Sequence, residues 1–539
     1  MSHAPRVLLR GGHVYAPDAP AATAMLTVGE TIGWLGSEDD AEAHADTADR
    51  VVQLQGRLVM PGFVDAHAHL AMTGFALQSL DLSSADSLTE ALDQLAATSR
   101  SHPGPLVYAH GWDETQWPEG RPPTMGEVDR AVGDRLAYVL RVDSHSAVVS
   151  SALVDRCPEL QRADGWRGAG LVERDAHHVV RAALDRLRTP GDRREAIVAA
   201  LRAAAAHGIT SVHELNAPHI APATDFATIR EIADDMVVPE VVPYWGALID
   251  EGSAGSDEEE MGGPVVGYAG DLCMDGAIGS RTAALSHEYA DADTSGHLYL
   301  DRSQVADHVI ACTRNRKQAG FHVIGDRAAH EVMAGFTAAA AVVGEDVMVA
   351  ARHRMEHVEM LDDEAIATMA RLGIVASVQP AFDAAWGAPG QLYERRLGAR
   401  AVSMNPYGSL QRAGVRLAFG SDTPVTPLDP WGAVRAAVRH HCPQQRMSVH
   451  SAVDAHTRGG HRARRDDDAG VLRPGSAATY AVWTMDHLTA GQVSPGSTDD
   501  PAAHGTQAPA LPDLSLDAAQ PHCVRTVIGG TTAFSTEED

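Results

Sequence analysis

Lysine is almost absent from this chain of 539 residues: Lys317 is the only one, and every other position counted as Lys or Arg is arginine. Cysteine is also scarce, and no Cys-x-x-Cys pair occurs among its five positions, Cys157, Cys273, Cys312, Cys442 and Cys523. An odd number of dispersed cysteines fits a reduced compartment. It excludes a thiolate zinc cluster of the finger type.

Long apolar runs are missing as well, and basic side chains are fewer than acidic ones. No stretch approaches eighteen uncharged apolar residues, which argues against a membrane span, and no secretory signal is apparent. Basic side chains number 43 against 72 acidic ones, a formal net charge of −29. Such a surface repels nucleic acid and anionic membranes. We therefore expect a cytoplasmic protein whose partner is a small-molecule substrate, with the oligomeric state open and a homodimer the commonest arrangement.

Both ends of the chain are rich in short strands and turns. Strand-like segments occur at 7–15, 25–28 and 31–36 near the N-terminus, and again at 477–483 and 523–528. Two β-rich ends around a long middle section predict one small β domain built from both termini. We assign residues 1–60 and 465–539 to it, and we expect an irregular excursion at 486–520.

The middle of the chain alternates short apolar runs with Ala-rich helical stretches such as 194–207 and 304–319. This alternation is typical of parallel βα units. We therefore expect residues 61–464 to form a closed (β/α)8 barrel of the TIM type, with its active site at the C-terminal ends of the strands. Residues 71–205 are too long for one connection, and we interpret them as an insertion after the first strand. The eight strands are expected near 62–67, 209–214, 239–246, 267–273, 320–324, 353–358, 374–379 and 415–421.

Histidines and one aspartate mark the ends of several of these strands. Residues two apart in a strand face the same side, so His67 and His69 both point inward at the end of the first strand. His322, His357 and Asp422 end later strands. Taken singly, each of these is an ordinary structural histidine or a helix-capping aspartate. Together they offer imidazoles and a carboxylate at one end of a barrel, a set that suits Zn²⁺ or a similar divalent metal.

Further segments occur in a fixed order that is found in a known family. They are Gly111-Trp112-Asp113-Glu114, Asp143-Ser144-His145-Ser146-Ala147, Gly208-Ile209-Thr210-Ser211-Val212-His213-Glu214, Asp275-Gly276-Ala277-Ile278-Gly279-Ser280-Arg281-Thr282-Ala283 and Gly470-Val471-Leu472-Arg473-Pro474-Gly475. With these segments the chain resembles the amidohydrolase superfamily, in the branch that includes N-substituted formamide deformylases, from the N-terminal strands to about residue 483. The resemblance implies an α/β fold with a (β/α)8 barrel and a small β-sandwich from the two chain ends.

The resemblance also implies roles for the strand-end residues. His67 and His69 would hold the more buried metal ion, His322 and His357 the second, and Asp422 would contact metal and shuttle a proton. One position departs from the family pattern. The family commonly has a lysine four residues before the Asp-Gly of the segment around Asp275, and carboxylation makes that lysine a bridge between two metals.

Asp271 occupies the position of that lysine. Lys317 cannot replace the lysine, because we place it in the helix before His322 rather than at a strand end. Asp271 either bridges two metals, binds one, or leaves a site with a single ion. Cys273 shares its inward face by the two-residue period and is a weaker candidate ligand, with a buried structural thiol as the ordinary alternative.

We therefore predict an enzyme that hydrolyses a C–N bond of an amide or N-substituted formamide. A metal-activated hydroxide would attack the carbonyl carbon, and Asp422 would move the proton. His145 either contacts the substrate or has a capping or packing role. The alternatives are hydrolysis of a cyclic amide, carbamate or ester at the same site, and a non-catalytic paralogue that keeps the barrel as a binding scaffold. The missing lysine favours the paralogue, whereas the retention of four histidines and Asp422 argues against it.

Overall fold

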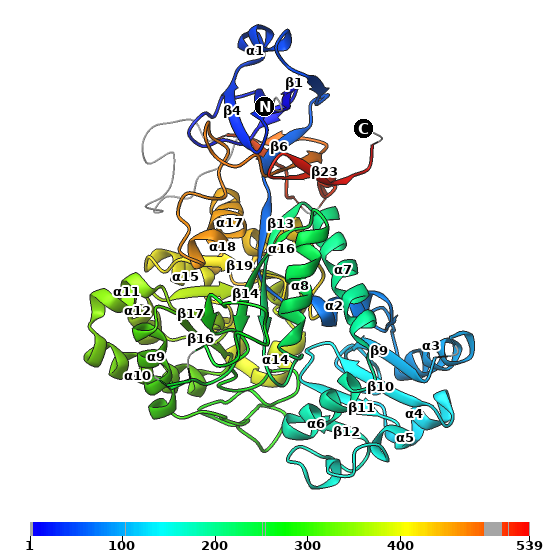
Figure 1. Cartoon of the computed structure of the whole chain (residues 1–539). Coiled ribbons are helices and arrows are strands. Elements are labelled where there is room, and N and C mark those ends of the chain that lie inside the picture. Colours follow the sequence, from blue (N-terminus) through cyan, green and yellow to red (C-terminus); the bar gives the residue numbers. More distant parts are fainter. Residues whose placement is uncertain are drawn as a thin grey trace.

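An eight-stranded parallel sheet forms the centre of the molecule in the computed structural model, which describes residues 4–102, 104–250, 252–253, 255–489, 509–515 and 517–537 (Figure 1). Each of the eight predicted barrel strands is present. In order around the sheet they are β7 (Phe63–Ala68), β13 (Ile209–Asn216), β14 (Glu240–Trp245), β15 (Gly267–Tyr268), β16 (Gln318–Val323), β17 (Arg354–His357), β18 (Val375–Val378) and β19 (Leu417–Phe419).

The first and last strands meet beyond their ends and close the barrel. Ala68 and Thr423 form a parallel bridge, and the Asp422 N–H donates to the His67 carbonyl oxygen at 2.7 Å. Gly420 lies so close to β7 that a Cβ atom there would come within 2.5 Å of the His67 nitrogen. Closure therefore requires a residue without a side chain at this point.

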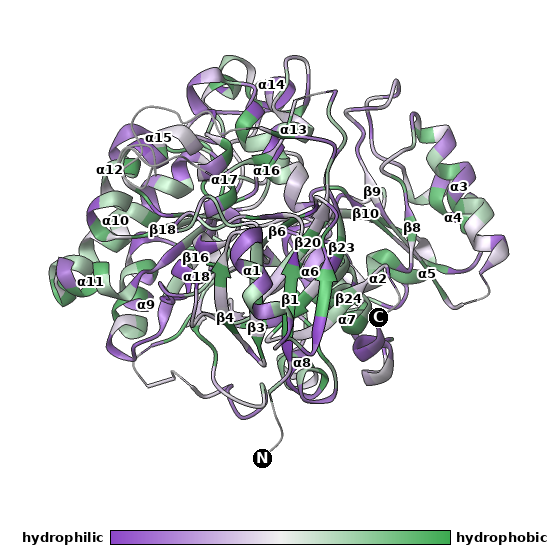
Figure 2. Ribbon diagram, turned by 90° about the horizontal axis from the view of Figure 1, so that it is seen from above, coloured by the Kyte–Doolittle hydropathy of each residue, from purple (hydrophilic) through white to green (hydrophobic). Residues whose placement is uncertain are grey.

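Helices surround the barrel on its outer side, as the view from above in Figure 2 shows. Ala196, Ile197 and Ala200 of α7 recur at helical spacing and are buried, so small side chains let this helix pack close to the sheet. The helix predicted at 304–319 ends earlier, at Arg314, because Arg316 takes a left-handed φ of 58°. The helices of this part are α2 (Leu70–Leu77), α7 (Pro190–Ala206), α8 (Thr224–Asp235), α9 (Arg302–Arg314), α10 (Asp326–Val343), α11 (Glu345–Ala351), α12 (Asp363–Leu372), α13 (Pro380–Trp386), α14 (Leu392–Leu397), α15 (Tyr407–Arg412), α16 (Pro430–Arg439), α17 (Val449–His456) and α18 (Arg458–Ala463).

The long connection after the first barrel strand builds a separate five-stranded sheet with the order β12-β11-β10-β9-β8. Two apolar clusters cover its faces, one around Trp112 and Val139 and the other around Tyr138 and Leu140. Alternate residues of β10 thus face opposite cores, as a strand covered on both sides requires. The elements are β8 (Leu80–Asp81), α3 (Leu88–Ser101), β9 (Leu106–Trp112), α4 (Met125–Val132), β10 (Leu136–Arg141), β11 (Ser146–Val149), α5 (Ser151–Val154), β12 (Leu171–Glu173) and α6 (Arg174–Asp185).

The two chain ends together form a β-sandwich. One sheet has the order β4-β3-β1-β5 and the other β2-β6-β20-β23-β24, so the second sheet mixes strands from both termini. Leu9, Met25, Val59 and Val482 pack in the core between them. The strands are β1 (Arg6–Arg10), β2 (His13–Val14), β3 (Ala24–Val28), β4 (Thr31–Gly36), β5 (Arg50–Gln53), β6 (Leu58–Pro61), β20 (Tyr480–Thr484), β23 (His522–Ile528) and β24 (Thr531–Ser535), and helix α1 covers Glu38–Ala45.

Part of the predicted irregular excursion at 486–520 can be followed. Strands β21 (Leu488–Thr489) and β22 (Leu511–Pro512) pair there, and residues 490–508 lie outside the described part of the chain. In the described residues, no one helix has the length and apolar character needed to cross a membrane, and the sharply bent pair α10 and α11 meets those criteria only by length and composition.

Aromatic rings connect the sandwich to the end of the barrel at which the strands begin. Phe63, the first residue of β7, is fully buried. Its ring lies edge-on to Trp431 of α16 at 5.3 Å and to Trp483 of β20 at 5.6 Å between ring centroids. Trp431 and Trp483 also contact each other edge-on. Such aromatic pairs contribute beyond the area that they bury.

We expect Phe63→Ala to lower the free energy of unfolding by about 3–5 kcal/mol, because it leaves a cavity among these rings. Denaturant unfolding followed by tryptophan fluorescence measures the change. Val402→Ala is the control: Val402 is 65% exposed, and its replacement should change the free energy by no more than about 0.5 kcal/mol. Equal midpoints for the two variants would contradict the proposed role of Phe63.

Candidate functional site

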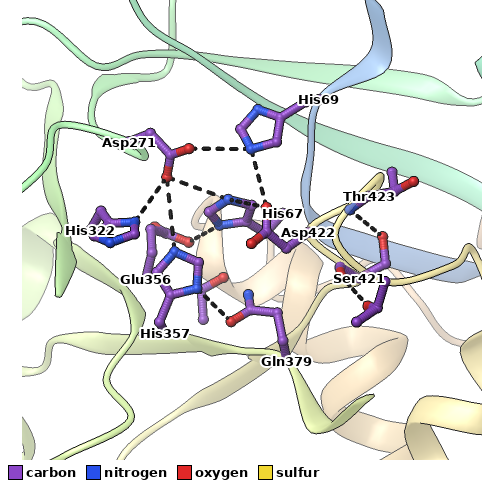
Figure 3. A network of polar contacts seen from close by, with 12 residues as sticks. His67, His69, Asp271, His322, Glu356, His357, Gln379, Ser421, Asp422 and Thr423 are labelled. Carbon is purple, nitrogen blue, oxygen red and sulfur yellow. Dashed lines mark hydrogen bonds and ion pairs between the residues drawn. The ribbon is translucent and has the colours of Figure 1, made fainter. Parts of the chain in front are cut away.

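All six side chains predicted as metal ligands meet at the C-terminal end of the barrel (Figure 3). They come from the ends of five strands, which parallel strands bring to one edge. His67 lies in β7 and His69 directly follows it, Asp271 follows β15, His322 lies in β16, His357 ends β17 and Asp422 follows β19.

Asp271 lies at the centre of this group and contacts all four imidazoles. Its Oδ2 lies 3.2 Å from His69 Nε2, and its Oδ1 lies 3.5 Å from His67 Nε2. The same Oδ1 lies 3.6 Å from His322 Nδ1 and 3.9 Å from His357 Nε2. The carboxylate thus stands between two histidine pairs, where a ligand shared by two metal ions would have to lie.

Asp422 approaches the first histidine pair from the other side. Its Oδ1 lies 3.3 Å from His67 Nε2 and 3.1 Å from His69 Nε2. The backbone is left-handed at Asp422, with φ of 56°, and at His357, with φ of 69°. Non-glycine residues rarely hold such angles, and those that do concentrate at functional sites. Adjacent residues of a strand normally point to opposite sides. The left-handed backbone at His357 lets its ring lie near Asp271 while the adjacent Glu356 contacts His67.

Three of the four imidazoles are held by a hydrogen bond at the ring nitrogen that faces away from Asp271. His67 Nδ1 donates to Glu356 Oε2 at 3.0 Å, and His357 Nδ1 donates to Gln379 Oε1 at 2.8 Å. His322 Nε2 donates to the Gly276 carbonyl oxygen at 3.3 Å. Because these acceptors hold the ring protons, the lone pairs of the opposite nitrogens are available to a metal ion.

A buried arginine inside the barrel supports Glu356. Arg354 is fully buried, and its Nε and Nη2 donate to the two Glu356 oxygens at 2.6 and 2.9 Å. Its Nη1 lies 2.9 Å from His213 Nδ1, and its guanidinium lies over the Tyr244 ring, 4.5 Å from the centroid. Burial raises the pKa of Glu356, but Arg354 and His67 lower it to about 2. Glu356 is therefore an anion that holds the proton on His67.

The donor set fits a divalent metal. His67 Nε2, His357 Nε2 and Asp271 Oδ1 are buried and have no hydrogen-bond partner among the described residues. Buried polar atoms without a partner are costly, and a cation shared by these atoms accounts for them. Burial lowers the pKa of His69, yet the carboxylates of Asp271 and Asp422 raise it to about 9. A bound cation would replace the protons that these carboxylates otherwise attract.

Cys273 and Lys317 are not part of the ligand cluster. Cys273 Sγ contacts the Asp271 carbonyl oxygen at 3.5 Å and lies 3.8 Å from His219 Nε2, and it belongs to none of the ligand groups found in the described residues. Lys317 lies in the loop between α9 and β16, so its predicted place in a helix is wrong. Its Nζ donates to Glu258 and to the Val265 carbonyl oxygen. Lys317 precedes β16, at the barrel end remote from the cluster, so it cannot bridge metals.

His145 reaches the cluster from the insertion, in the turn between β10 and β11. Its ring centroid lies 5.1 Å from that of His322, and it lines the cavity in front of the cluster together with His69 and Asp422. Desolvation and the neighbouring His322 hold the pKa of His145 well below its usual value. His145 is therefore neutral near pH 7 and has one N–H to donate.

A buried ion network fixes the turn that carries His145. Arg141 donates to Asp113 at 3.1 Å, to Glu114 at 2.9 Å and to Asp143 at 2.8 Å. Ser280, from the loop after β15, donates to the same Asp143 oxygen at 2.6 Å. Three segments that carried the family resemblance thus meet here, and they join the insertion to the barrel.

Sequence reasoning missed the side chains that orient the ligands, namely Arg354, Glu356 and Gln379. A usable signal was present, because Arg354 and Glu356 are charged residues two apart in a strand expected to be buried. A buried charge needs a partner of opposite sign. That requirement predicts the Arg354–Glu356 pair, whereas the contact from Glu356 to His67 depends on the closed barrel.

Comparison with known proteins gives one family match and several relatives. A family model described as "Amidohydrolase family" matches residues 50–534. The protein LONG AFTER FAR-RED 3 of Arabidopsis thaliana is 26% identical, over 88% of this chain and 86% of that protein. The N-substituted formamide deformylase of Arthrobacter pascens is 23% identical, over 86% of this chain and 90% of the enzyme.

A solved structure shares the fold. An uncharacterised metal-dependent hydrolase from Pyrococcus furiosus superposes with a TM-score of 0.68 at 24% identity. The superposition covers 88% of this chain and 98% of that structure. At this level of identity the superposition shows a shared fold.

We expect Glu356→Gln to weaken metal binding by about 10–100-fold, the usual effect of losing a partner that orients a metal-bound histidine. The variant also leaves Arg354 without its carboxylate and should lose about 3–5 kcal/mol of stability. Competition with a coloured chelator measures the affinity. Glu331→Gln, which removes the partner of the exposed Arg302, is the matched control and should change neither quantity appreciably. Unchanged affinity in folded Glu356→Gln protein would refute the role of Glu356.

Proposed function

Because the chain belongs to the amidohydrolase family, we propose that it is a metal-dependent hydrolase that cleaves the C–N bond of an amide or N-substituted formamide. The observation that supports this most directly is the position of Asp271 among four imidazoles, with Asp422 beside two of them. We propose zinc as the metal, with His67 and His69 holding one ion, His322 and His357 a second, and Asp271 between them.

A divalent ion held by these histidines and Asp271 would lower the pKa of water to about 7, so that hydroxide is available at neutral pH, and would polarise a carbonyl group. Asp422 is the group that moves the proton. Burial raises the pKa of its carboxyl, but His67 and His69 hold that pKa below its usual value, so the group is ionised and can accept a proton. It then returns the proton to the leaving nitrogen, which must be protonated to depart.

His145 and the wall of the barrel mouth position the substrate. The neutral imidazole of His145 lies next to His322 and can donate a hydrogen bond to the carbonyl oxygen under attack. The Arg141 network holds this turn in place, so the donor is oriented before substrate binds. Preorganised donors of this kind are worth more than those that must be recruited during the reaction.

The similarity to an N-substituted formamide deformylase supports an amide substrate over an ester. Hydrolysis of a cyclic amide, carbamate or ester uses the same groups and is the nearest alternative. A non-catalytic scaffold is disfavoured, because it has no physical need for buried imidazole nitrogens without partners.

We expect chelation to abolish hydrolysis and added Zn²⁺ to restore it. Asp422→Asn should lower kcat by at least about 100-fold, since general acid–base catalysis contributes about 10²–10⁴, and should leave the fold unchanged. A panel of N-substituted formamides, linear and cyclic amides, carbamates and esters, assayed for the released amine or acid, measures both effects. The exposed Asp346→Asn is the matched control. Full activity in metal-free protein would overturn the proposal.

A further inference from the structure

The cavity in front of the metal-ligand cluster has one wall that carries positive charge. This cavity has a volume of about 630 Å³ including its open mouth. Part of its lining is the cluster itself, and another part comes from α6 of the insertion and the loop after β13. The side chains of that second part, the cationic wall, are Arg174, His177, His178, Arg181 and His219.

Arg181 has no acidic partner. Its Nη2 donates to the Ser144 carbonyl oxygen at 2.7 Å, and no ion pair with a carboxylate is found for it among the described residues. More deeply buried arginines of this chain, such as Arg141 and Arg193, each pair with two or more carboxylates. Partly buried arginines elsewhere, such as Arg230 and Arg400, also donate only to carbonyl oxygens, but Arg181 differs from them because it lines the cavity in front of the metal-ligand cluster. At that position a bound anion can pair with its guanidinium group.

Arg174 contributes an unsatisfied donor to the same wall. Its Nη2 pairs with Asp164 at 2.9 Å, but its Nε is buried and has no partner among the described residues. The backbone at Arg174 is left-handed, with φ of 48°, a conformation that long side chains rarely adopt. Two guanidinium groups on the first two turns of one helix therefore present N–H donors to the cavity.

The other charged and titratable groups of the cavity leave this positive wall uncompensated. Asp271 and Asp422 belong to the metal-ligand cluster, and Asp143 pairs with Arg141. Burial, with Arg181 nearby, lowers the pKa of His178 to about 4 and that of His219 to about 3. These histidines are neutral near pH 7 and supply further N–H donors without adding charge.

A second cavity that adjoins the cluster is mostly apolar. It shares Asp143, His145, His322, Asp422 and Val425 with the first, and its other polar residues are Arg141, His357 and Glu359. Its walls include Ile278, Phe382, Trp386, Leu392 and Tyr393. The reacting group would therefore lie between an aromatic pocket and a cationic wall, which is the arrangement that a substrate with one apolar and one anionic end requires.

We propose that the amide hydrolysed at this site carries a carboxylate, which Arg181 and Arg174 bind, while an apolar group packs against Phe382 and Trp386. The inference rests on the proposed function, because it names the substrate class for the same site. Arg181 makes the stronger contribution, since Arg174 already has Asp164 as a partner.

The test compares racemic N-formylphenylalanine with its primary amide, which has the same shape and no charge. We expect the wild-type protein to show a kcat/KM at least about 10-fold higher for the acid, since hydrogen bonds to charged groups contribute about 1.5–3 kcal/mol. Arg181→Met should lower kcat/KM for the acid by about 10–100-fold, mainly through KM, and leave the value for the amide within about 3-fold. Arg186→Met, an exposed arginine at the end of the same helix, is the matched control.

A binding measurement separates this inference from the proposed function. Calorimetric titration of the chelated, full-length protein with N-acetylphenylalanine and with its amide requires no catalysis. Tighter binding of the acid that disappears in Arg181→Met supports the carboxylate site even if neither formyl compound is hydrolysed. Equal binding of acid and amide by the wild-type protein overturns the inference. It leaves the proposed function intact if any amide in the panel is hydrolysed.

Discussion

A positive charge occupies the inside of the barrel, where folds of this type usually pack layers of branched apolar side chains. Arg354 is fully buried, and removing it from water is costly unless its N–H groups find partners. Glu356, the Ala66 carbonyl oxygen and Ser377 accept from it. Because Glu356 must remain ionised beside Arg354, it is also available to hold the His67 proton. One electrostatic requirement of the barrel core thus sets the orientation of a metal ligand.

The candidate site lies where two separately packed parts of the molecule meet. The barrel supplies the ligand cluster at its strand ends, and the insertion supplies His145, Arg174 and Arg181. The insertion has its own apolar cores, so it can keep its shape without contributing to the barrel. The hydrogen bonds and ion pairs around Arg141 and Asp143 connect the two parts. Such a division lets the insertion vary with the substrate while the metal ligands remain fixed.

Much of this arrangement follows from the sequence, because local patterns determine it. The alternation of apolar runs with Ala-rich helices predicts the eight barrel strands. The positions of the histidines and Asp422 at the ends of these strands predict the ligand cluster. The features that the sequence did not predict depend on contacts between residues far apart in the chain or on the backbone conformation of single residues. Glu356 acts on a residue 289 positions away, and the early end of α9 depends on the left-handed backbone at Arg316. The absence of the family lysine was visible in the sequence, but the central place of Asp271 required the assembled cluster.

Closure of the barrel between β7 and β19 has a consequence for synthesis of the protein. His69 and Asp422 contact each other although 353 positions separate them in the chain. At a translation rate of about 5–20 residues per second, they leave the ribosome roughly 20–70 s apart. During that interval the nascent chain exposes an open sheet edge and a histidine pair whose carboxylate partner does not yet exist. A chain truncated before β19 would therefore carry metal-binding histidines on an unclosed sheet, which makes complete translation a condition for a protected site.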